Sequence, residues 1–556
     1  MSASTPSQVA RPANPPQLQR EVGLGGLISI TVGGIIGSGI FALMATMGSV
    51  AGPAALLGLL LLGGVIIVLA LPYAELGAAY PRTGGPYALP RRALGDYAGF
   101  LMGWGYFLYA FVGTAAIIDV FVEYLGTYLP GLVTSSGIIT YTGIGISLVF
   151  LAVFTLLNIV GVKWGSVFAV VSTAAKLIPL LLFAVVGLFF LREGGLGNFT
   201  DFGFAPFGWT GVMFAMALGF FAFTGFEAAV IPSEEVKEPH RTIPIATIVS
   251  VLIVTAIYAF VGFTAIASLH WTAVGVPVGA WGQTGGVLLS NLADGWGLAA
   301  MGAIVVAGAL ISTAGAGGDW VLLQGRIPFA MARDNLFVQK LGEVDHRFRT
   351  PAIALTFASV LTAVVLLALP SFPEVVLIAS ITALVPYAAA ALSLTVLRRS
   401  DPATARPFRL PGASVLAPAG FVLATILIYW ASWPWTLVGA LLMLAGFPLY
   451  YLVGRPKLPE LGKVAWIAVY LVGIIVLSYL GNPFFVYQNF LPIQPIGLYG
   501  TPLDLLLLTI FGLAMYAWAY RSALWSPAGP RVVGESRAPS AGAVPSGGLP
   551  APGREG

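Results

Sequence analysis

Cysteine is absent from the 556 residues of this chain, and histidine occurs only three times. The absence of thiols excludes disulfide frameworks, thiolate metal sites and cysteine nucleophiles. The three histidines fall in or beside predicted loops, which leaves little material for haem ligation or zinc catalysis, so we expect no cofactor and no metal site. Charged residues are also scarce at 9%, whereas 58% of the residues are hydrophobic. Soluble domains carry about 25% charged residues, so this composition indicates a protein that lies largely in a lipid bilayer.

Long apolar runs make up most of the sequence. They predict an all-α polytopic membrane protein with about fourteen transmembrane helices. The approximate cores of these spans are 27–48, 53–72, 98–120, 143–162, 166–190, 209–231, 244–268, 297–318, 352–370, 374–397, 414–433, 435–454, 464–480 and 502–520. Residues 1–22 and 523–556 are polar or rich in Pro, Gly, Ser and Ala, and we predict disordered tails there.

The positive charges indicate the orientation of the chain. If the N-terminus is cytoplasmic, every Lys and Arg lies on the cytoplasmic side except Arg192, which falls outside, and Lys176, which falls within a span. This bias predicts an even number of spans with both termini in the cytoplasm. It also accounts for the net charge of +4, so we expect a lipid bilayer and no nucleic acid as partner.

A glycine-rich stretch interrupts the first span. Residues 33–41 are Gly-Gly-Ile-Ile-Gly-Ser-Gly-Ile-Phe. Each glycine costs a helix about 1 kcal/mol relative to alanine, and lipid tolerates an opened backbone only where protein or a cavity covers it. We therefore predict a broken helix, in which the half-helix after Gly37, Ser38 and Gly39 offers free N–H groups to a carboxylate. For this stretch alone, close helix–helix packing through small residues is the alternative.

A second break is predicted in the sixth span, where Thr224 and Gly225 lie among aromatic residues and Glu227 follows near mid-bilayer. An intramembrane carboxylate marks a functional site by default. For this span alone, the alternative is a kinked helix in which Glu227 faces a crevice for structural reasons.

The two breaks stand first in two consecutive sets of five spans. Such a pattern indicates an inverted-repeat transporter with its substrate between the breaks. Carbonyls freed around Ile35, Phe221, Ala222 and Thr224 can accept hydrogen bonds from an ammonium group. A zwitterionic α-amino acid would satisfy both the N–H groups of the first break and these carbonyls.

Lys176 lies about ten residues inside the fifth span, too deep to reach the interface easily. Desolvation disfavours the charged form of such an amine, so Lys176 could exchange a proton during a transport cycle. A fixed structural cation is the alternative.

Other charged residues can be explained by structural roles, without a part in transport. Glu75 and Arg82, and likewise Asp334 with Arg326 or Arg333, are predicted to form ion pairs that brace the cytoplasmic side.

Asp119 and Glu123 lie one helical turn apart near the outer end of the third span. They could attract cations, but an interfacial position is the simpler interpretation.

Five groups of residues occur in order along the first ten spans. They are residues 33–41, Tyr73-Ala74-Glu75-Leu76 with residues 80–85, the sixth span, residues 234–239 with 241–244, and Gly325-Arg326 with residues 330–335. In this order they resemble the amino acid–polyamine–organocation superfamily of transporters. The resemblance implies a LeuT-like fold of five plus five inverted helices. The four further spans predicted at the C-terminal end take the count two beyond the twelve usual in the family, as in some cationic amino acid transporters. The resemblance is closest to the cationic amino acid transporter-like, proton-coupled branch, in which a lysine matching Lys176 stands where sodium-coupled relatives bind sodium.

The same resemblance implies roles for individual residues. Main-chain groups near Ser38 and Gly39 would hold the substrate carboxylate. Ile35, Phe221 and Thr224 would hold its amine, and Phe226 would gate access. The position of Glu227 varies in the family, so it could recognise a cationic side chain, relay protons or brace a gate. Aromatic residues around the site would suit apolar or aromatic substrates instead.

We therefore expect a plasma-membrane transporter of amino acids that works by alternating access, most simply as a proton symporter. Its parts would be two five-helix repeats at 23–195 and 205–400, followed by four helices at 410–522. An amino acid exchanger without ion coupling is the alternative, and an amino-acid-sensing transceptor is less favoured because the tails are short. We expect no enzymatic activity, because no metal cluster, nucleophile–base pair or phosphate loop is apparent.

Overall fold

The computed structural model describes residues 22–81, 85–134, 137–161, 166–191, 195–201, 203–270, 272, 287–369, 371–453, 461–481 and 493–524. Within these ranges the side chains of 166–172, 234 and 461 are not described. Arg82 and Arg192 therefore lie outside the described residues.

The described residues form helices and isolated β-bridges, without an extended sheet. The helices, in chain order, are α1 Leu24–Ile35, α2 Gly39–Ala51, α3 Ala55–Ala79, α4 Gly85–Leu94, α5 Asp96–Leu125, α6 Tyr141–Val160, α7 Ser166–Gly187, α8 Gly208–Phe223, α9 Pro239–Ala267, α10 Leu288–Gly295, α11 Ala299–Arg333, α12 Ala352–Ala368, α13 Phe372–Ser400, α14 Ala413–Trp430, α15 Trp435–Leu444, α16 Gly446–Val453, α17 Leu461–Leu480 and α18 Leu503–Leu524. The prediction of an all-α polytopic protein is confirmed.

Twelve helical segments in the described ranges are long and apolar enough to cross a membrane. The predicted count of fourteen is not confirmed, for two reasons. α2 and α3 follow one another through a single 3-10 turn and form one segment of 41 residues. α12 has only 17 residues, about 26 Å at 1.5 Å per residue, and is shorter than each of the twelve segments.

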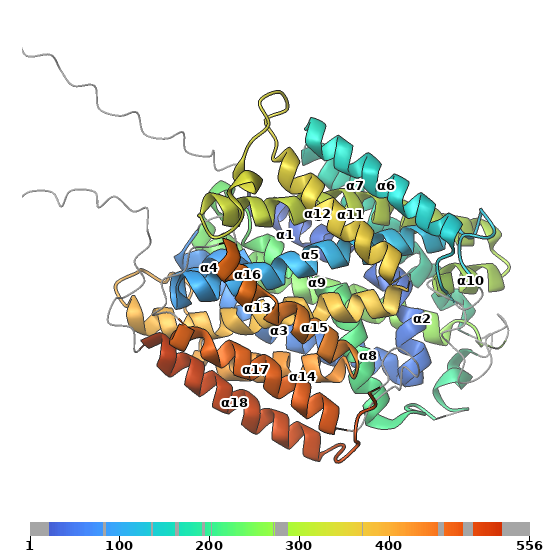
Figure 1. Cartoon of the computed structure of the whole chain (residues 1–556). Helices are drawn as coiled ribbons and strands as arrows, with labels where there is room; N and C mark the ends of the chain where they lie inside the picture. Colours follow the sequence, from blue (N-terminus) through green and yellow to red (C-terminus); the bar gives the residue numbers. More distant parts are fainter. Residues whose placement is uncertain are drawn as a thin grey trace, which may run out of the picture.

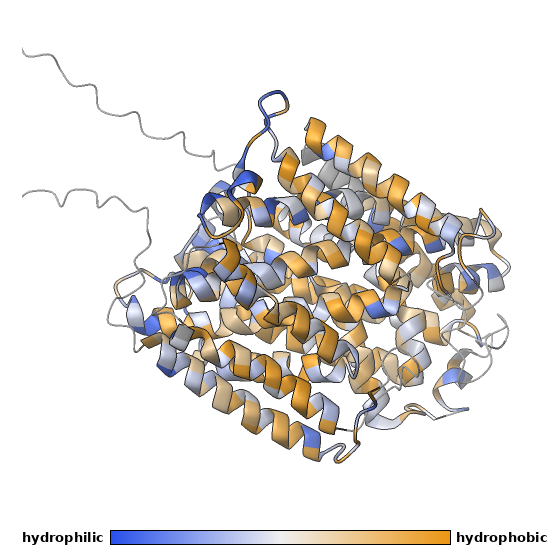
Figure 2. Cartoon of the chain, in the orientation of Figure 1, coloured by the Kyte–Doolittle hydropathy of each residue, from blue (hydrophilic) through white to orange (hydrophobic). Residues whose placement is uncertain are grey.

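α5 and α13 form the centre of the bundle (Figure 1). The most apolar window of α13 is completely buried and that of α5 is 94% buried. α17 and α18 lie at one edge of the bundle, where they pack against α14 and α15 (Figure 1). Apolar residues follow the helices along their length, whereas hydrophilic residues gather near the helix ends (Figure 2). This distribution is the one expected of helices that lie in lipid.

One end of the bundle carries α4 and the C-terminal ends of α11 and α13, and we call it the basic end. Its arginines include Arg91, Arg92, Arg333, Arg398 and Arg399. The other end, where α5 ends and α11 and α13 begin, is called the distal end.

The ion pairs of the basic end differ from the predicted ones. Asp334 binds Arg91 of α4 at 2.5 Å, so its predicted pairing with a neighbour on its own helix is wrong. The reason is that the C-terminal end of α11 is held against α4 and α5. Glu75 of α3 binds Arg398 at the end of α13. Its predicted partner Arg82 lies outside the described residues, so that pairing stays a prediction.

Candidate functional site

The first predicted break is present between α1 and α2. α1 ends at Ile35, and the next residue, Ile36, leaves the helical conformation with φ −78° and ψ 88°. The carbonyl of Ile35 accepts a hydrogen bond from the N–H of Gly37 at 2.9 Å. α2 begins at Gly39, and the N–H groups of Gly39 and Ile40 have no partner within the helix, whereas those of Phe41 and Ala42 donate to the carbonyl of Ser38. The hydroxyl of Ser38 is buried at this point without a hydrogen-bond partner among the described residues.

The second predicted break follows α8. Thr224 is extended, with ψ 157°, and Gly225 is left-handed, with φ +100°. A short 3-10 helix, η4, then covers Phe226–Ala229. The carbonyl of Phe221 accepts hydrogen bonds from the N–H and the hydroxyl of Thr224, at 3.3 and 2.7 Å.

The two breaks touch through their backbones. A Cβ atom added to Gly39 would lie 2.6 Å from the Cα of Ala222. A Cβ added to Gly225 would lie 2.5 Å from the carbonyl oxygen of Gly34. Both distances are too short for real side-chain atoms, so glycine is required at each position for the breaks to meet. The structure thus brings together the nine residues predicted to bind substrate, and their role in binding stays a prediction.

Tyr258 of α9 links the two breaks and was missed by the sequence analysis. Its hydroxyl lies 2.9 Å from the carbonyl oxygen of Ala222 and 3.4 Å from that of Ile35. A hydroxyl has one proton, so it donates fully to only one of these carbonyls at a time. Tyr258 therefore engages two of the carbonyls that were predicted to bind an ammonium group.

Glu227 caps the second break. One of its carboxylate oxygens accepts a hydrogen bond from the hydroxyl of Tyr106 at 2.9 Å, and the other accepts one from the N–H of Gly225 at 3.1 Å. The side chain is buried, and Tyr73 and Tyr387 pack around η4 through Phe226. Of the three roles considered for Glu227, these contacts favour a brace that holds the break open.

This assignment predicts how Glu227→Gln behaves. The amide is neutral, so its oxygen accepts only a weaker hydrogen bond from Gly225, and its NH2 group can only donate to the hydroxyl of Tyr106; both charge-assisted bonds are lost. A hydrogen bond to a charged group contributes about 1.5–3 kcal/mol, and substrate affinity should fall about ten-fold or more. Tyr106→Phe should weaken binding in the same sense, because it removes one of these two contacts. Binding measured for neutral and cationic amino acids checks this prediction. If Glu227 is a brace, its replacement lowers the affinity for both kinds of amino acid. A loss of affinity confined to cationic amino acids would instead assign Glu227 to recognition of their side chains.

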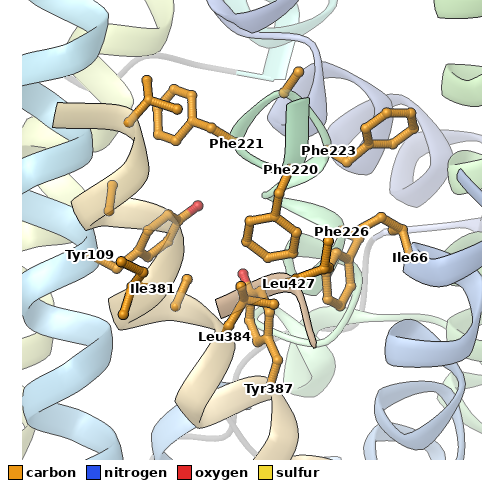
Figure 3. Packing of buried hydrophobic residues seen from close by; sticks show 14 of the residues in the cluster. Ile66, Tyr109, Phe220, Phe221, Phe223, Phe226, Ile381, Leu384, Tyr387 and Leu427 are labelled. Atoms are coloured by element: carbon orange, nitrogen blue, oxygen red, sulfur yellow. The ribbon is translucent and has the colours of Figure 1, made fainter. Parts of the chain in front are cut away.

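Aromatic side chains line the region between α5, α8 and α13. The hydroxyl groups of Tyr109 and Tyr387 point toward the same space beside the rings of Phe220 and Phe221 (Figure 3). Trp320 of α11 closes another side, with ring centroids 4.9 Å from Tyr109 and 5.8 Å from Phe221. The region thus presents apolar ring faces and two tyrosine hydroxyl groups close to the second break.

Lys176 lies beside the first break, as the predicted internal role requires. Its side chain is 3% exposed, and its amine donates to the carbonyl of Gly33 at 3.3 Å. The hydroxyl of Ser312 donates to the carbonyl of Gly37 at 3.0 Å, so α7 and α11 each hold one side of the break.

Asp319 of α11 is an acidic neighbour of Lys176 that the sequence analysis missed. The two charges interact electrostatically, and Arg326 is a second cationic neighbour of Asp319. Asp319 retains exposed surface in the fold, unlike Lys176. It follows Ser312 by seven residues, two turns along the same helix face. That spacing is the one signal by which the sequence could have placed it near the break.

A metal site is not apparent. The described part of the chain contains no group of three Asp, Glu or His side chains placed to hold a metal ion.

Comparison with known proteins gives a consistent result. A family model described as amino acid permease matches residues 23–511. The chain is 29% identical to the aspartate-proton symporter of Bacillus subtilis (strain 168) over 90% of this chain and 96% of that protein. It is 31% identical to the serine/threonine exchanger SteT of the same organism, over 79% of this chain and 98% of that protein. It is also 30% identical to the mouse (Mus musculus) cationic amino acid transporter 4, over 69% of this chain and 61% of that protein.

Proposed function

Because the chain belongs to the amino acid permease family, we propose that it takes up amino acids together with protons, by alternating access around the two broken helices. It is a multi-pass membrane protein and a transporter rather than an enzyme. The observation that best supports proton coupling is the buried amine of Lys176, bonded to the carbonyl of Gly33 at the first break. A relative named as a proton symporter, similar over nearly its whole length, supports the same reading.

The substrate would bridge the two breaks. Its carboxylate would bind the N–H groups at Ser38 and Gly39, where the positive end of the α2 dipole favours an anion, and would compete with the carbonyl of Ile35 for the N–H of Gly37. Its ammonium group would bind carbonyls of the second break and compete there with the hydroxyl of Tyr258. Phe226, which packs on Tyr73 and Tyr387, would gate the path toward the basic end.

Lys176 and Asp319 would carry the coupling. When Lys176 is charged, its ammonium group can hold the first break through Gly33 and attract the Asp319 carboxylate. When Lys176 loses its proton, both interactions weaken. Because Asp319 retains exposed surface, it would offer a route by which that proton leaves the protein interior. The protonation state of Lys176 would thus bias which side of the site is open.

The orientation proposed is one with the basic end and both termini in the cytoplasm, in the plasma membrane, because arginines concentrate at that end. Residues 23–195 and 205–400 would form the two inverted repeats. The helices in 410–522 would lie outside this core, as the peripheral position of α17 and α18 suggests.

Uptake into proteoliposomes tests the proposal. Purified wild type, Lys176→Ala and the control Lys340→Ala, an exposed lysine, would be given a panel of labelled amino acids with an inward proton gradient, with and without sodium. We expect wild type and Lys340→Ala to accumulate substrate without sodium. Lys176→Ala should bind substrate and let it equilibrate across the membrane. It should not accumulate substrate, because the charge that couples transport to protons is lost.

Exchange is the second candidate, supported by the similarity to an exchanger. If wild-type flux requires amino acid inside the vesicles and ignores the proton gradient, symport is wrong. Lys176 would then be a fixed cation that holds the first break.

A further inference from the structure

Three of the carbonyl groups predicted to bind the substrate ammonium group have hydrogen-bond donors within the chain. The carbonyl oxygen of Ala222 lies 2.9 Å from the hydroxyl of Tyr258, and that of Ile35 lies 3.4 Å from the same hydroxyl. The carbonyl of Phe221 accepts hydrogen bonds from the N–H and the hydroxyl of Thr224. The protein can therefore satisfy these carbonyls with its own groups.

Tyr258 differs from Thr224 in reaching both breaks from another helix. It stands on α9, which packs against α1 and against η4. The side chain of Tyr258 is completely buried. The ring of Phe223 packs edge-on against it, with ring centroids 5.1 Å apart. The hydroxyl of Tyr258 is thus held between the two breaks by packed elements on both sides.

The hydroxyl and a substrate ammonium group can perform the same task at these carbonyls. A buried carbonyl without a donor costs free energy, and this cost matters most when the site is closed to water. Hydrogen bonds from a charged ammonium group are about twice as strong as those from a neutral hydroxyl. An entering ammonium group can therefore displace the hydroxyl, and the hydroxyl can take its place again when the substrate leaves.

This replacement bears on the difference between net uptake and exchange. A transporter that has released its substrate at the basic end must return to face the distal end before it can take up another. In alternating access this return passes through a closed arrangement that contains no substrate. An exchanger avoids that step, because a second amino acid fills the site on the way back. The ease of closing without substrate therefore decides whether net uptake is fast.

We propose that Tyr258 is an internal substitute for the substrate ammonium group, which allows the transporter to close and return without substrate. During the return its hydroxyl binds the carbonyl of Ala222, beside that of Ile35. During the loaded step the substrate ammonium group displaces it. Tyr258 thereby favours net uptake over exchange. This inference rests on the proposed transport of amino acids, and it goes beyond it by assigning a residue to the return step.

Tyr258→Phe tests the inference, because it removes the hydroxyl and keeps the ring. Two fluxes of a labelled amino acid would be measured in proteoliposomes with equal pH on both sides. One is net uptake into vesicles without internal amino acid, and the other is exchange into vesicles loaded with the same unlabelled amino acid. Net uptake should fall about ten-fold, because a buried acceptor loses its donor in the return step. Exchange should be largely retained, because the substrate supplies the donor.

Equilibrium binding gives a second readout of the same variant. Because the hydroxyl no longer competes for the carbonyls, the substrate should bind to Tyr258→Phe about five-fold more tightly, the effect of one hydrogen bond. A residue that only supports the structure of the site would show the opposite sign, since its loss would weaken binding and slow both fluxes together.

The matched control is Tyr470→Phe. Tyr470 of α17 is also buried, and its hydroxyl lies 3.0 Å from that of Thr425 in α14. This variant loses a comparable hydrogen bond far along the chain from either break. It should keep the wild-type ratio of net uptake to exchange.

Phe223→Leu provides a further test that does not depend on the folding of Tyr258→Phe. It keeps the hydroxyl of Tyr258 and removes the ring that packs on it. The ratio of net uptake to exchange should fall in the same direction, by less than in Tyr258→Phe. Size-exclusion chromatography would establish that each variant is folded.

The outcomes separate this inference from the proposed symport. In a wild type that accumulates substrate with protons, an equal loss of both fluxes in Tyr258→Phe, or no loss of net uptake, overturns the role of Tyr258 alone. If wild-type net uptake ignores the proton gradient but is still slowed selectively by Tyr258→Phe, symport alone is wrong. A wild type that exchanges without any net uptake also overturns the role of Tyr258, because it does not return without substrate.

Discussion

Replacing Gly225 by alanine should lower substrate affinity by at least about thirty-fold, and transport at low substrate concentration should fall with it. Gly225 has φ +100°, a conformation that costs a residue with a side chain about 1–2 kcal/mol. The added Cβ would also lie 2.5 Å from the carbonyl oxygen of Gly34 and 3.1 Å from the nitrogen of Ile35. Both contacts are with backbone that cannot rotate away, and overpacking of this kind costs about 1–3 kcal/mol. Together these terms lower the affinity of the assembled site by at least about thirty-fold.

The matched control is Gly64→Ala. Gly64 lies within α3, and a Cβ added there meets nothing within 4 Å. Alanine is the better helix former, so this variant should bind and transport as wild type does. Binding would be measured by equilibrium assay on detergent-purified protein of confirmed monodispersity. A folded Gly225→Ala variant with wild-type affinity would show that contact between the two breaks is not needed for the site.

The broken helices were predictable because their causes are local. Glycine weakens a helix wherever it stands, so the stretch around Gly37 and the pair Thr224-Gly225 could be recognised without knowledge of what surrounds them. The burial of Lys176 was predictable for a similar reason, since its depth within an apolar span follows from counting residues. In each case the structure places the residue where the local pattern indicates.

The partners of these residues were not predictable, because they come from distant parts of the chain. Tyr258 lies 223 residues from Ile35, and Arg398 lies 323 residues from Glu75. The sequence around a single tyrosine in an apolar helix does not indicate which carbonyl its hydroxyl group will bind. The burial of Asp119, which is 1% exposed, was not predictable for the same reason: the position of a residue along a span does not say which neighbouring helix covers it.

The ion pair that holds the basic end together should be the most sensitive point for stability. Glu75 is completely buried, and its two oxygens accept hydrogen bonds from Arg398 at 2.8 and 2.5 Å. The N–H of Leu410, in the segment between α13 and α14, donates to the same carboxylate at 2.7 Å. Arg406 lies 3.6 Å away. One side chain therefore joins α3, α13 and the approach to α14.

Glu75→Ala should lower the free energy of unfolding by about 3–5 kcal/mol, because it leaves mostly buried guanidinium groups without their counter-charge. The melting temperature in detergent should fall by on the order of 5–10 °C. Glu343→Ala, which removes an exposed carboxylate, should have little effect. The double variant Glu75→Ala with Arg398→Ala should be less destabilised than the sum of the two single variants, because neither charge is then left alone. Strict additivity would mean that the pair contributes no interaction energy, and the three elements would have to be held together by apolar packing.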